Sequence, residues 1–282
     1  MSYLLPVTVF LLMTSIGMSL RLSEVLHLWR SLKLAEWLRL IFATFIAPPV
    51  IALFAARAFH LSLPETGGLF LVSVAPGAPL LTRNLARKGY DMHVAASYQL
   101  WAACMVPIMI PLLVLGAGKL YNRDIWIPPH RLLLQIAENQ FLPLAVGIFA
   151  ASLLPTLTKK LQPWVNAVGN GMFLVVLVAV LIKLGGALRS VTPLVPVAAL
   201  MIALTSMSVM RLFSFSPRVR HAFALCNVNR HVGLALLLAG DYLHARNALP
   251  AVACYALIAP ILMVLYARFH AQSMKASAVN AA

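Results

Sequence analysis

The chain has 282 residues, of which 62% are hydrophobic and only 10% are charged, whereas soluble domains carry roughly a quarter charged residues. This composition excludes an ordinary soluble enzyme and predicts one polytopic, all-α membrane domain over residues 1–282. The net charge of +15 comes from basic residues in short loops between apolar runs, so we attribute it to membrane topology and expect no nucleic-acid partner.

Nine apolar stretches are long enough to cross a bilayer, which takes about 20 residues each. They lie at 3–20, 35–58, 66–88, 92–117, 131–154, 163–185, 191–212, 219–241 and 248–269. The first has no basic stretch before it, which favours a first membrane helix over a cleaved signal peptide. Charge and proline content predict loops at 21–33, 155–163 and 214–220.

The third segment contains the sequence SVAPGAP, with Pro76, Gly77 and Pro79 halfway along it. Proline removes a backbone donor and clashes with the preceding turn, so we expect the helix to be interrupted here. Thr82 and Asn84 follow the interruption and are candidates for contact with a bound molecule.

The fourth and fifth segments hold the candidates for coupling to an ion. Ser97 and Gln99 lie early in the fourth, and Glu138 lies about a third of the way into the fifth. Polar side chains along a helix seam are common, and a hydrated Glu138 near a helix end is the alternative to a proton carrier or a partner for a buried cation.

The eighth segment carries four polar or charged side chains in five positions, Asn227, Asn229, Arg230 and His231, with Gly233 just after them. Such side chains within a membrane are expensive and usually serve a function. A break in the helix here would need backbone partners inside the protein. We therefore predict that these four residues bind a substrate, His231 being either titratable or neutral and hydrogen-bonded.

The two interrupted segments occupy matching positions in two groups of four. Residues 1–117 form the first predicted repeat, 131–154 a linker helix and 163–270 the second repeat, inserted in the opposite direction. Two broken helices in matching positions are typical of inverted-repeat transporters, whose site lies where the breaks meet. The alternative is a pair of kinked helices without a site.

The orientation follows from the basic residues. With the N-terminus outside, fourteen of the 22 Lys and Arg residues fall on the inner side, seven on the outer side, and Arg230 within the membrane. This bias predicts an outer N-terminus and a cytoplasmic C-terminus. We expect a multi-pass protein of a bacterial inner membrane.

Several landmarks in order resemble the bile acid:sodium symporter family. They are GMSLRL (17–22), FATFIAPPVIALF (42–54), LPETGG (63–68) with SVAPGAP (73–79), LARKGYD (85–91) and RHVGLALLLA (230–239). The resemblance covers about residues 3–270 and corresponds to the nine-helix members. It implies a panel domain, a core domain with two crossing helices, and alternating access between them.

The resemblance also implies sodium coupling, but the residues depart from the family pattern. In the second crossing helix the family's glutamate and glutamine, which are sodium ligands, fall on Cys226 and Arg230, and its substrate-facing asparagine falls on His231. A ligand pair of the first crossing helix falls on Leu81 and Thr82, and an earlier glutamine near Thr44. A guanidinium repels a cation and stays charged at any ordinary pH.

These observations predict a secondary transporter of a small organic anion in which Arg230 stands where relatives hold a cation. Arg230 would bind the anion directly, or it would pair structurally with Glu138 or a helix carbonyl end. A sodium-dependent symporter with different ligands and a non-transporting membrane sensor are the alternatives. No catalytic motif is present, so we expect no enzyme. We expect no cofactor or metal beyond Na⁺ or H⁺ as a coupling ion, and no obligate protein partner besides the lipid bilayer.

Overall fold

The computed structural model describes residues 4–20, 29, 33–77, 92–120, 129–188, 191–212, 217–242 and 248–279 of the chain. Every regular element in these ranges is helical, as the composition predicted. The elements are α1 (Leu4–Ser19), α3 (Leu34–Ile41), the π turn η1 (Phe42–Ile46), α4 (Ala47–Ala58), α5 (Leu63–Val74), α7 (Met92–Leu120), α8 (Pro129–Ile136), the π turn η2 (Ala137–Phe141), α9 (Leu142–Leu153), α10 (Pro155–Leu188), α11 (Val195–Ser208), the 3-10 turn η3 (Val209–Leu212), α12 (Pro217–Val228), α13 (Val232–Tyr242) and α14 (Ala248–Val279).

Seven helices in the described part are long and apolar enough to cross a membrane. They correspond to seven of the nine predicted segments, with α12 and α13 together making one of them. The other two segments, 3–20 and 66–88, correspond to the shorter apolar helices α1 and α5. The second half of segment 66–88 lies outside the described residues, so the count of nine and the inverted repeat stay predictions.

The loop predicted at 155–163 is wrong. α10 begins at Pro155 and continues through Pro163 to Leu188. Proline is favoured in the first turn of a helix, where its missing N–H has no helical partner to lose. Pro155 therefore starts the helix, and the charged pair Lys159 and Lys160 lies exposed on its surface.

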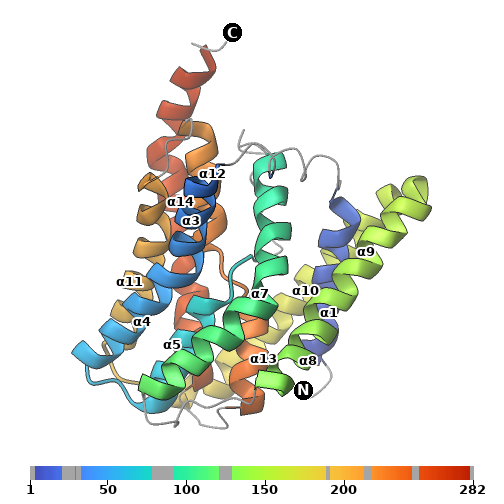
Figure 1. Cartoon of the computed structure of the whole chain (residues 1–282). Coiled ribbons are helices and arrows are strands. Elements are labelled where there is room, and N and C mark those ends of the chain that lie inside the picture. Colours follow the sequence, from blue (N-terminus) through green and yellow to red (C-terminus); the bar gives the residue numbers. More distant parts are fainter. Residues whose placement is uncertain are drawn as a thin grey trace.

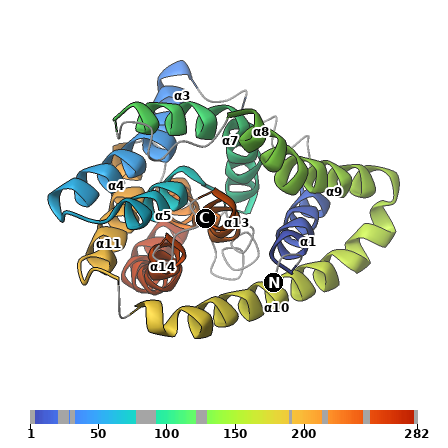
Figure 2. The same cartoon turned by 90° about the horizontal axis from the view of Figure 1, so that it is seen from below.

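The helices form two groups, which Figures 1 and 2 show from two directions. A side group contains α1, α8, η2, α9 and α10, and a central group contains α3, α4, α5, α7 and α11 to α14. Contacts of α1 with α13, of α10 with α14 and of α7 with α8 join the two groups. The panel and core domains that the resemblance implied stay predictions.

Glycines allow very close packing within the side group. A Cβ atom on Gly17 of α1 would lie 2.2 Å from the carbonyl oxygen of Leu144, and one on Gly147 of α9 would lie 2.2 Å from the carbonyl oxygen of Thr14. Only residues without a side chain let two helix backbones approach so closely. The pair therefore fixes α1 against α9.

Both predicted interruptions coincide with the ends of helices. α5 ends at Val74 and residues 75–77 are not helical, with Gly77 at a φ of 85° that favours glycine. The eighth segment is broken at residues 229–231, between α12 and α13. In Figure 1, α5 and α13 share the lower half of the central group, and α12 lies above the break.

Candidate functional site

The two interruptions are joined by a backbone hydrogen bond. The N–H of His231 donates to the carbonyl oxygen of Ala75 at 2.7 Å. In a regular helix the Ala75 carbonyl would accept from residue 79, but residue 79 is proline and has no N–H. The break in one segment thus supplies the acceptor that the break in the other segment uses.

A proline pair frees two more carbonyls in the helix 34–58. Residues 42–46 form a π turn, in which the N–H of Ala47 bonds to Phe42. The donors that would reach the carbonyls of Ala43 and Thr44 come from positions 48 and 49, which are both proline. These carbonyls face a buried region of the central group and need donors from other helices.

Arg230 supplies one of those donors. Its side chain is 1% exposed. One terminal guanidinium nitrogen donates to the Thr44 carbonyl at 2.9 Å, and the other donates to the Ser206 hydroxyl and the Asn227 amide oxygen, both at 3.1 Å. All three acceptors are neutral oxygens, so these hydrogen bonds stabilise the positive charge through dipoles.

Asn227 links the elements around this charge. Its amide nitrogen donates to the carbonyls of Ala43 at 3.0 Å and Ser206 at 2.7 Å. Its amide oxygen accepts from the Tyr98 hydroxyl at 2.9 Å as well as from Arg230. Asn227 therefore uses both ends of its amide to connect η1, α7, α11 and the break.

His231 caps the N-terminus of α13 with its ring. The Nδ1 atom accepts a hydrogen bond from the N–H of Leu234 at 3.0 Å. An imidazole nitrogen that accepts carries no proton, so the neutral ring carries its proton on Nε2. The buried Nε2 atom has no hydrogen-bond partner among the described residues. His231 therefore presents an unused donor at the positive end of a helix.

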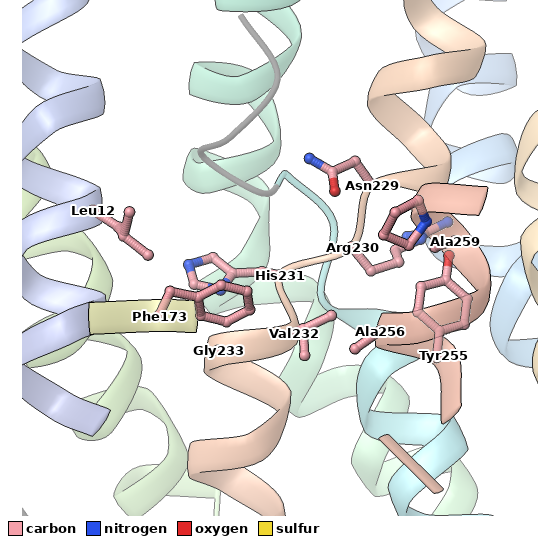
Figure 3. A pocket seen from close by; sticks show the side chains of 11 residues that line it. Leu12, Phe173, Asn229, Arg230, His231, Val232, Gly233, Tyr255, Ala256 and Ala259 are labelled. Atoms are coloured by element: carbon pink, nitrogen blue, oxygen red, sulfur yellow. The ribbon is translucent and has the colours of Figure 1, made fainter. Parts of the chain in front are cut away.

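A small pocket lies at this point, between the break and the side group (Figure 3). Its volume is about 60 Å³, and it is lined by Leu12 of α1, Phe173 of α10, residues 229–233 of the break, and Tyr255, Ala256, Ala259 and Pro260 of α14. Figure 3 shows the His231 ring on the side of Leu12 and Phe173, and Arg230 on the side of Tyr255. The ring and the guanidinium thus leave the break in opposite directions.

The predicted site residues fall into three groups. The first group lies at the pocket. The pocket is lined by Asn229, Arg230, His231 and Gly233. The Arg230 guanidinium donates hydrogen bonds to Thr44 and Asn227. The Thr44 hydroxyl also lies 3.4 Å from the Tyr98 hydroxyl.

The residues of the second group do not line this pocket. Ser97 and Gln99 are buried on α7, and Ser97 lines a separate small cavity with three tryptophans. Glu138 is exposed on η2, and the pairing of Glu138 with Arg230 is not formed. Pro76 and Gly77 lie at the first break, next to the bond between Ala75 and His231.

The third group, Pro79, Thr82 and Asn84, lies outside the described residues. Their predicted roles in the helix break and in substrate binding stay predictions.

Three residues of the site were not predicted from the sequence: Tyr98, Ser206 and Tyr255. The Tyr255 hydroxyl donates to the carbonyl of Val228 at 2.7 Å, at the end of α12. Each of these three residues brings one hydroxyl group to an otherwise apolar helix, and such a residue is equally well explained by a role in helix packing. The prolines at 48 and 49 were the available signal, because they show which carbonyls need a donor.

A comparison with family models supports the resemblance. The model described as the sodium bile acid symporter family matches residues 6–191, more than half of the chain. A search of curated proteins found no match. The matched residues include most of α1, the helix 34–58, α5, α7, α8, α9 and α10.

Proposed function

The chain belongs to the sodium bile acid symporter family, and from this premise we propose that it carries a small organic anion across the membrane by alternating access. We further propose that Arg230 replaces the coupling sodium ion of relatives as a fixed internal cation, so that transport depends little on sodium.

One observation carries the proposal: the buried Arg230 guanidinium is surrounded by a carbonyl, a hydroxyl and an amide oxygen from three different elements. Neutral and anionic oxygens are the ligands that hard cations prefer. The same resemblance assigns sodium ligands to the positions of Arg230 and Thr44. A guanidinium that already occupies these oxygens leaves no room for a hydrated cation and repels it.

The anion would bind on the opposite face of the break, in the pocket beside His231. The Nε2 proton of His231 is a donor without a described partner, and α13 begins directly after it. A helix N-terminus favours a negative group, and Arg230 adds a positive charge behind it. The sequence led us to expect direct contact between Arg230 and the anion. In the arrangement proposed here, His231 donates a hydrogen bond to the anion, and the positive charge of Arg230 attracts the anion from a greater distance.

The size of the pocket favours a small carboxylate. Its volume of about 60 Å³ corresponds to a few water molecules, since one water needs roughly 10–15 Å³ on the same measure. A steroid would enter only if α1 and α10 moved away from the break. Leu12 and Phe173 would contact the apolar part of the substrate, and Asn229 its polar part.

The second candidate function is a sodium-dependent symporter with a different ion site. The buried Ser97 hydroxyl favours it, because this oxygen has no hydrogen-bond partner among the described residues. Uptake into proteoliposomes separates the two functions. Vesicles preloaded with unlabelled short mono- and dicarboxylates would exchange them for the same labelled compounds, with taurocholate as the steroid comparison.

We expect exchange of a short carboxylate that is equal in sodium and in choline. A steep, saturable requirement for sodium would favour the symporter with other ligands. Failure of every carboxylate to exchange, with correctly folded and inserted protein, would overturn the transport proposal and favour a membrane sensor.

A further inference from the structure

A second polar cavity lies away from the transport site, where η3, the start of α12 and the later part of α14 meet. Its volume is about 310 Å³, which is within the usual range for small-ligand pockets of about 300–1,000 Å³. Arg211, Arg220, His221, His270 and Tyr266 supply its polar lining. None of the described residues that line it is acidic.

We propose that this cavity binds a phosphate group, carried either by an anionic lipid headgroup or by a small soluble phosphate compound. The proposal concerns a site separate from the pocket at His231 and does not depend on the proposed transport function.

The two arginines supply the charge and the geometry. A planar guanidinium can donate two parallel hydrogen bonds to phosphate oxygens, and two of them can match a doubly charged group. Arg211 is exposed and Arg220 is half-buried, so the cavity combines access from outside with a partly desolvated charge. The N-terminus of α12 at Pro217 adds to the positive field.

The aromatic residues form an ordered wall beside the arginines. The Tyr266 hydroxyl and His221 Nδ1 lie 2.7 Å apart and share a hydrogen bond. The Tyr266 ring stacks on His270 with centroids 4.2 Å apart, and the His221 and His270 rings are 4.5 Å apart. These contacts fix the rings before a ligand arrives, which reduces the entropy lost on binding.

The position suits a headgroup at a membrane surface. The cavity is lined by the start of α12 and the later part of α14, which lie towards the end of the molecule marked C in Figure 1. The basic-residue bias predicts this end to be cytoplasmic. Basic pockets between membrane helices on that side bind the phosphates of anionic lipids. The buried Met207 and Met210 supply an apolar floor that a glycerol or acyl segment would contact.

The test uses the full-length protein and measures binding by two probes. The lipid probe is phosphatidic acid in nanodiscs, with phosphatidylcholine as the neutral reference, and the soluble probe is glycerol phosphate in detergent, with chloride at equal ionic strength. The variants are Arg211→Gln with Arg220→Gln, and as a matched control Lys159→Gln with Lys160→Gln. The control removes the same charge from exposed residues on the same predicted side.

We expect the arginine pair of substitutions to weaken binding of at least one probe by about tenfold or more, and the lysine pair to change it by less than about twofold. Loss with phosphatidic acid alone identifies a lipid headgroup, and loss with glycerol phosphate identifies a soluble ligand. An equal loss of affinity in the arginine and lysine variants would show non-specific attraction to positive charge. Unchanged affinity in both variants would show that the cavity does not bind the probe. Either result would overturn the proposal.

A fold check by gel filtration accompanies the measurement. If the double glutamine variant does not fold, Arg211→Lys with Arg220→Lys decides, because it keeps both charges and removes only the planar donors. This variant should still bind the probe more weakly than wild type does. If Arg211→Lys with Arg220→Lys binds the probe as tightly as wild type does, the proposed site is wrong.

Discussion

His231 donates its backbone N–H to the Ala75 carbonyl at 2.7 Å, and this bond joins the residues that follow α5 to the break between α12 and α13. Ala75, like Ala43 and Thr44, is followed four or five residues later by a proline. The prolines remove the helical donors for these three carbonyls. Residues 227, 230 and 231 replace them, so one polar stretch satisfies acceptors that two other segments leave open.

Two substitutions of His231 should separate its role as a helix cap from its role in ligand binding. His231→Ala removes both the cap on Leu234 and the Nε2 donor. We expect a loss of stability of about 1 kcal/mol and at least about tenfold weaker binding of the transported carboxylate. His231→Asn keeps a capping oxygen and introduces the residue that the family resemblance places here, so it should regain stability without regaining full affinity.

Thermal melting and equilibrium binding in detergent measure the two effects. The exposed His130 is the control, and His130→Ala should change neither. If His231→Ala binds the carboxylate like wild type, His231 is only a helix cap.

Asn227 should be important for folding rather than for substrate contact. Asn227→Leu leaves the Ala43 carbonyl, the Ser206 carbonyl and the Tyr98 hydroxyl without this partner. Each buried polar group left unpaired costs about 1–3 kcal/mol, so we expect a large drop in melting temperature or loss of folded protein. Asn229→Leu, at the half-buried neighbour, should have a clearly smaller effect. Equal melting temperatures for the two variants would contradict the central role of Asn227.

The positions of the main helices could be predicted from the sequence because length and hydropathy decide them. The prediction for 248–269 lies within α14, and that for 92–117 lies within α7. The first break was predicted from its prolines. The second was predicted near residues 226–231, yet residues 226–228 are still helical, since the cross-helix bonds of Asn227 are compatible with a helix.

The hydroxyl groups around Arg230 and Asn227 could not be predicted, because they are set by how the helices pack. Tyr98, Ser206 and Tyr255 come from three helices far apart in the sequence, and each hydroxyl alone resembles a packing residue. The fixed cation was inferred from Arg230 itself, but the Glu138 alternative could be dismissed only when both side chains had been located. Prolines 48 and 49 were noted only as part of a family landmark, and their effect on the carbonyls of 43 and 44 became clear in the structure.

Gly17 should be intolerant of any side chain. A methyl group there would meet the Leu144 carbonyl at 2.2 Å, so Gly17→Ala must force α1 away from α9. Overpacking of this kind costs about 1–3 kcal/mol, and we expect a lower melting temperature in detergent. Gly171→Ala on α10 is the control, because a Cβ there meets nothing within 4 Å. An unchanged melting temperature for Gly17→Ala would contradict the packing of the side group.

Glu65 should make stability depend on pH at the start of α5. This buried carboxylate precedes the predicted span 66–88 and accepts from the Thr192 N–H at 2.7 Å and from Ser62. Burial raises the pKa of Glu65, but the hydrogen bonds from Thr192 and Ser62 outweigh it, and the pKa is lowered below its usual value. A lowered folded-state pKa gives stability that is present above the unfolded-state pKa and is lost as the pH falls towards the folded value.

We therefore expect the melting temperature of wild type to fall on acidification below about pH 4–5, and that of Glu65→Gln to be lower at neutral pH and to change less. Glu36→Gln is the control, since Glu36 caps the start of α3 at a more exposed position. Identical pH profiles for Glu65→Gln and wild type would show that this carboxylate does not carry the dependence.

Arg230 is the residue on which the functional account depends. Arg230→Gln removes the fixed charge and introduces the residue that the family resemblance places here, while the oxygens of Thr44, Ser206 and Asn227 remain. These oxygens would then be open to a small cation. Arg230→Lys keeps a charge but loses the planar fork, so it should be less stable than wild type without becoming sensitive to sodium.

The most direct measurement is the melting temperature of wild type and Arg230→Gln in detergent with sodium, potassium or choline chloride at equal ionic strength. We expect wild type to melt at the same temperature in all three salts. We also expect Arg230→Gln to be destabilised in choline and to be partly and saturably restored by sodium, more than by potassium. A saturable stabilisation of wild type by sodium, or an Arg230→Gln variant that folds but responds to all three salts alike, would contradict the claim that Arg230 stands in for the ion.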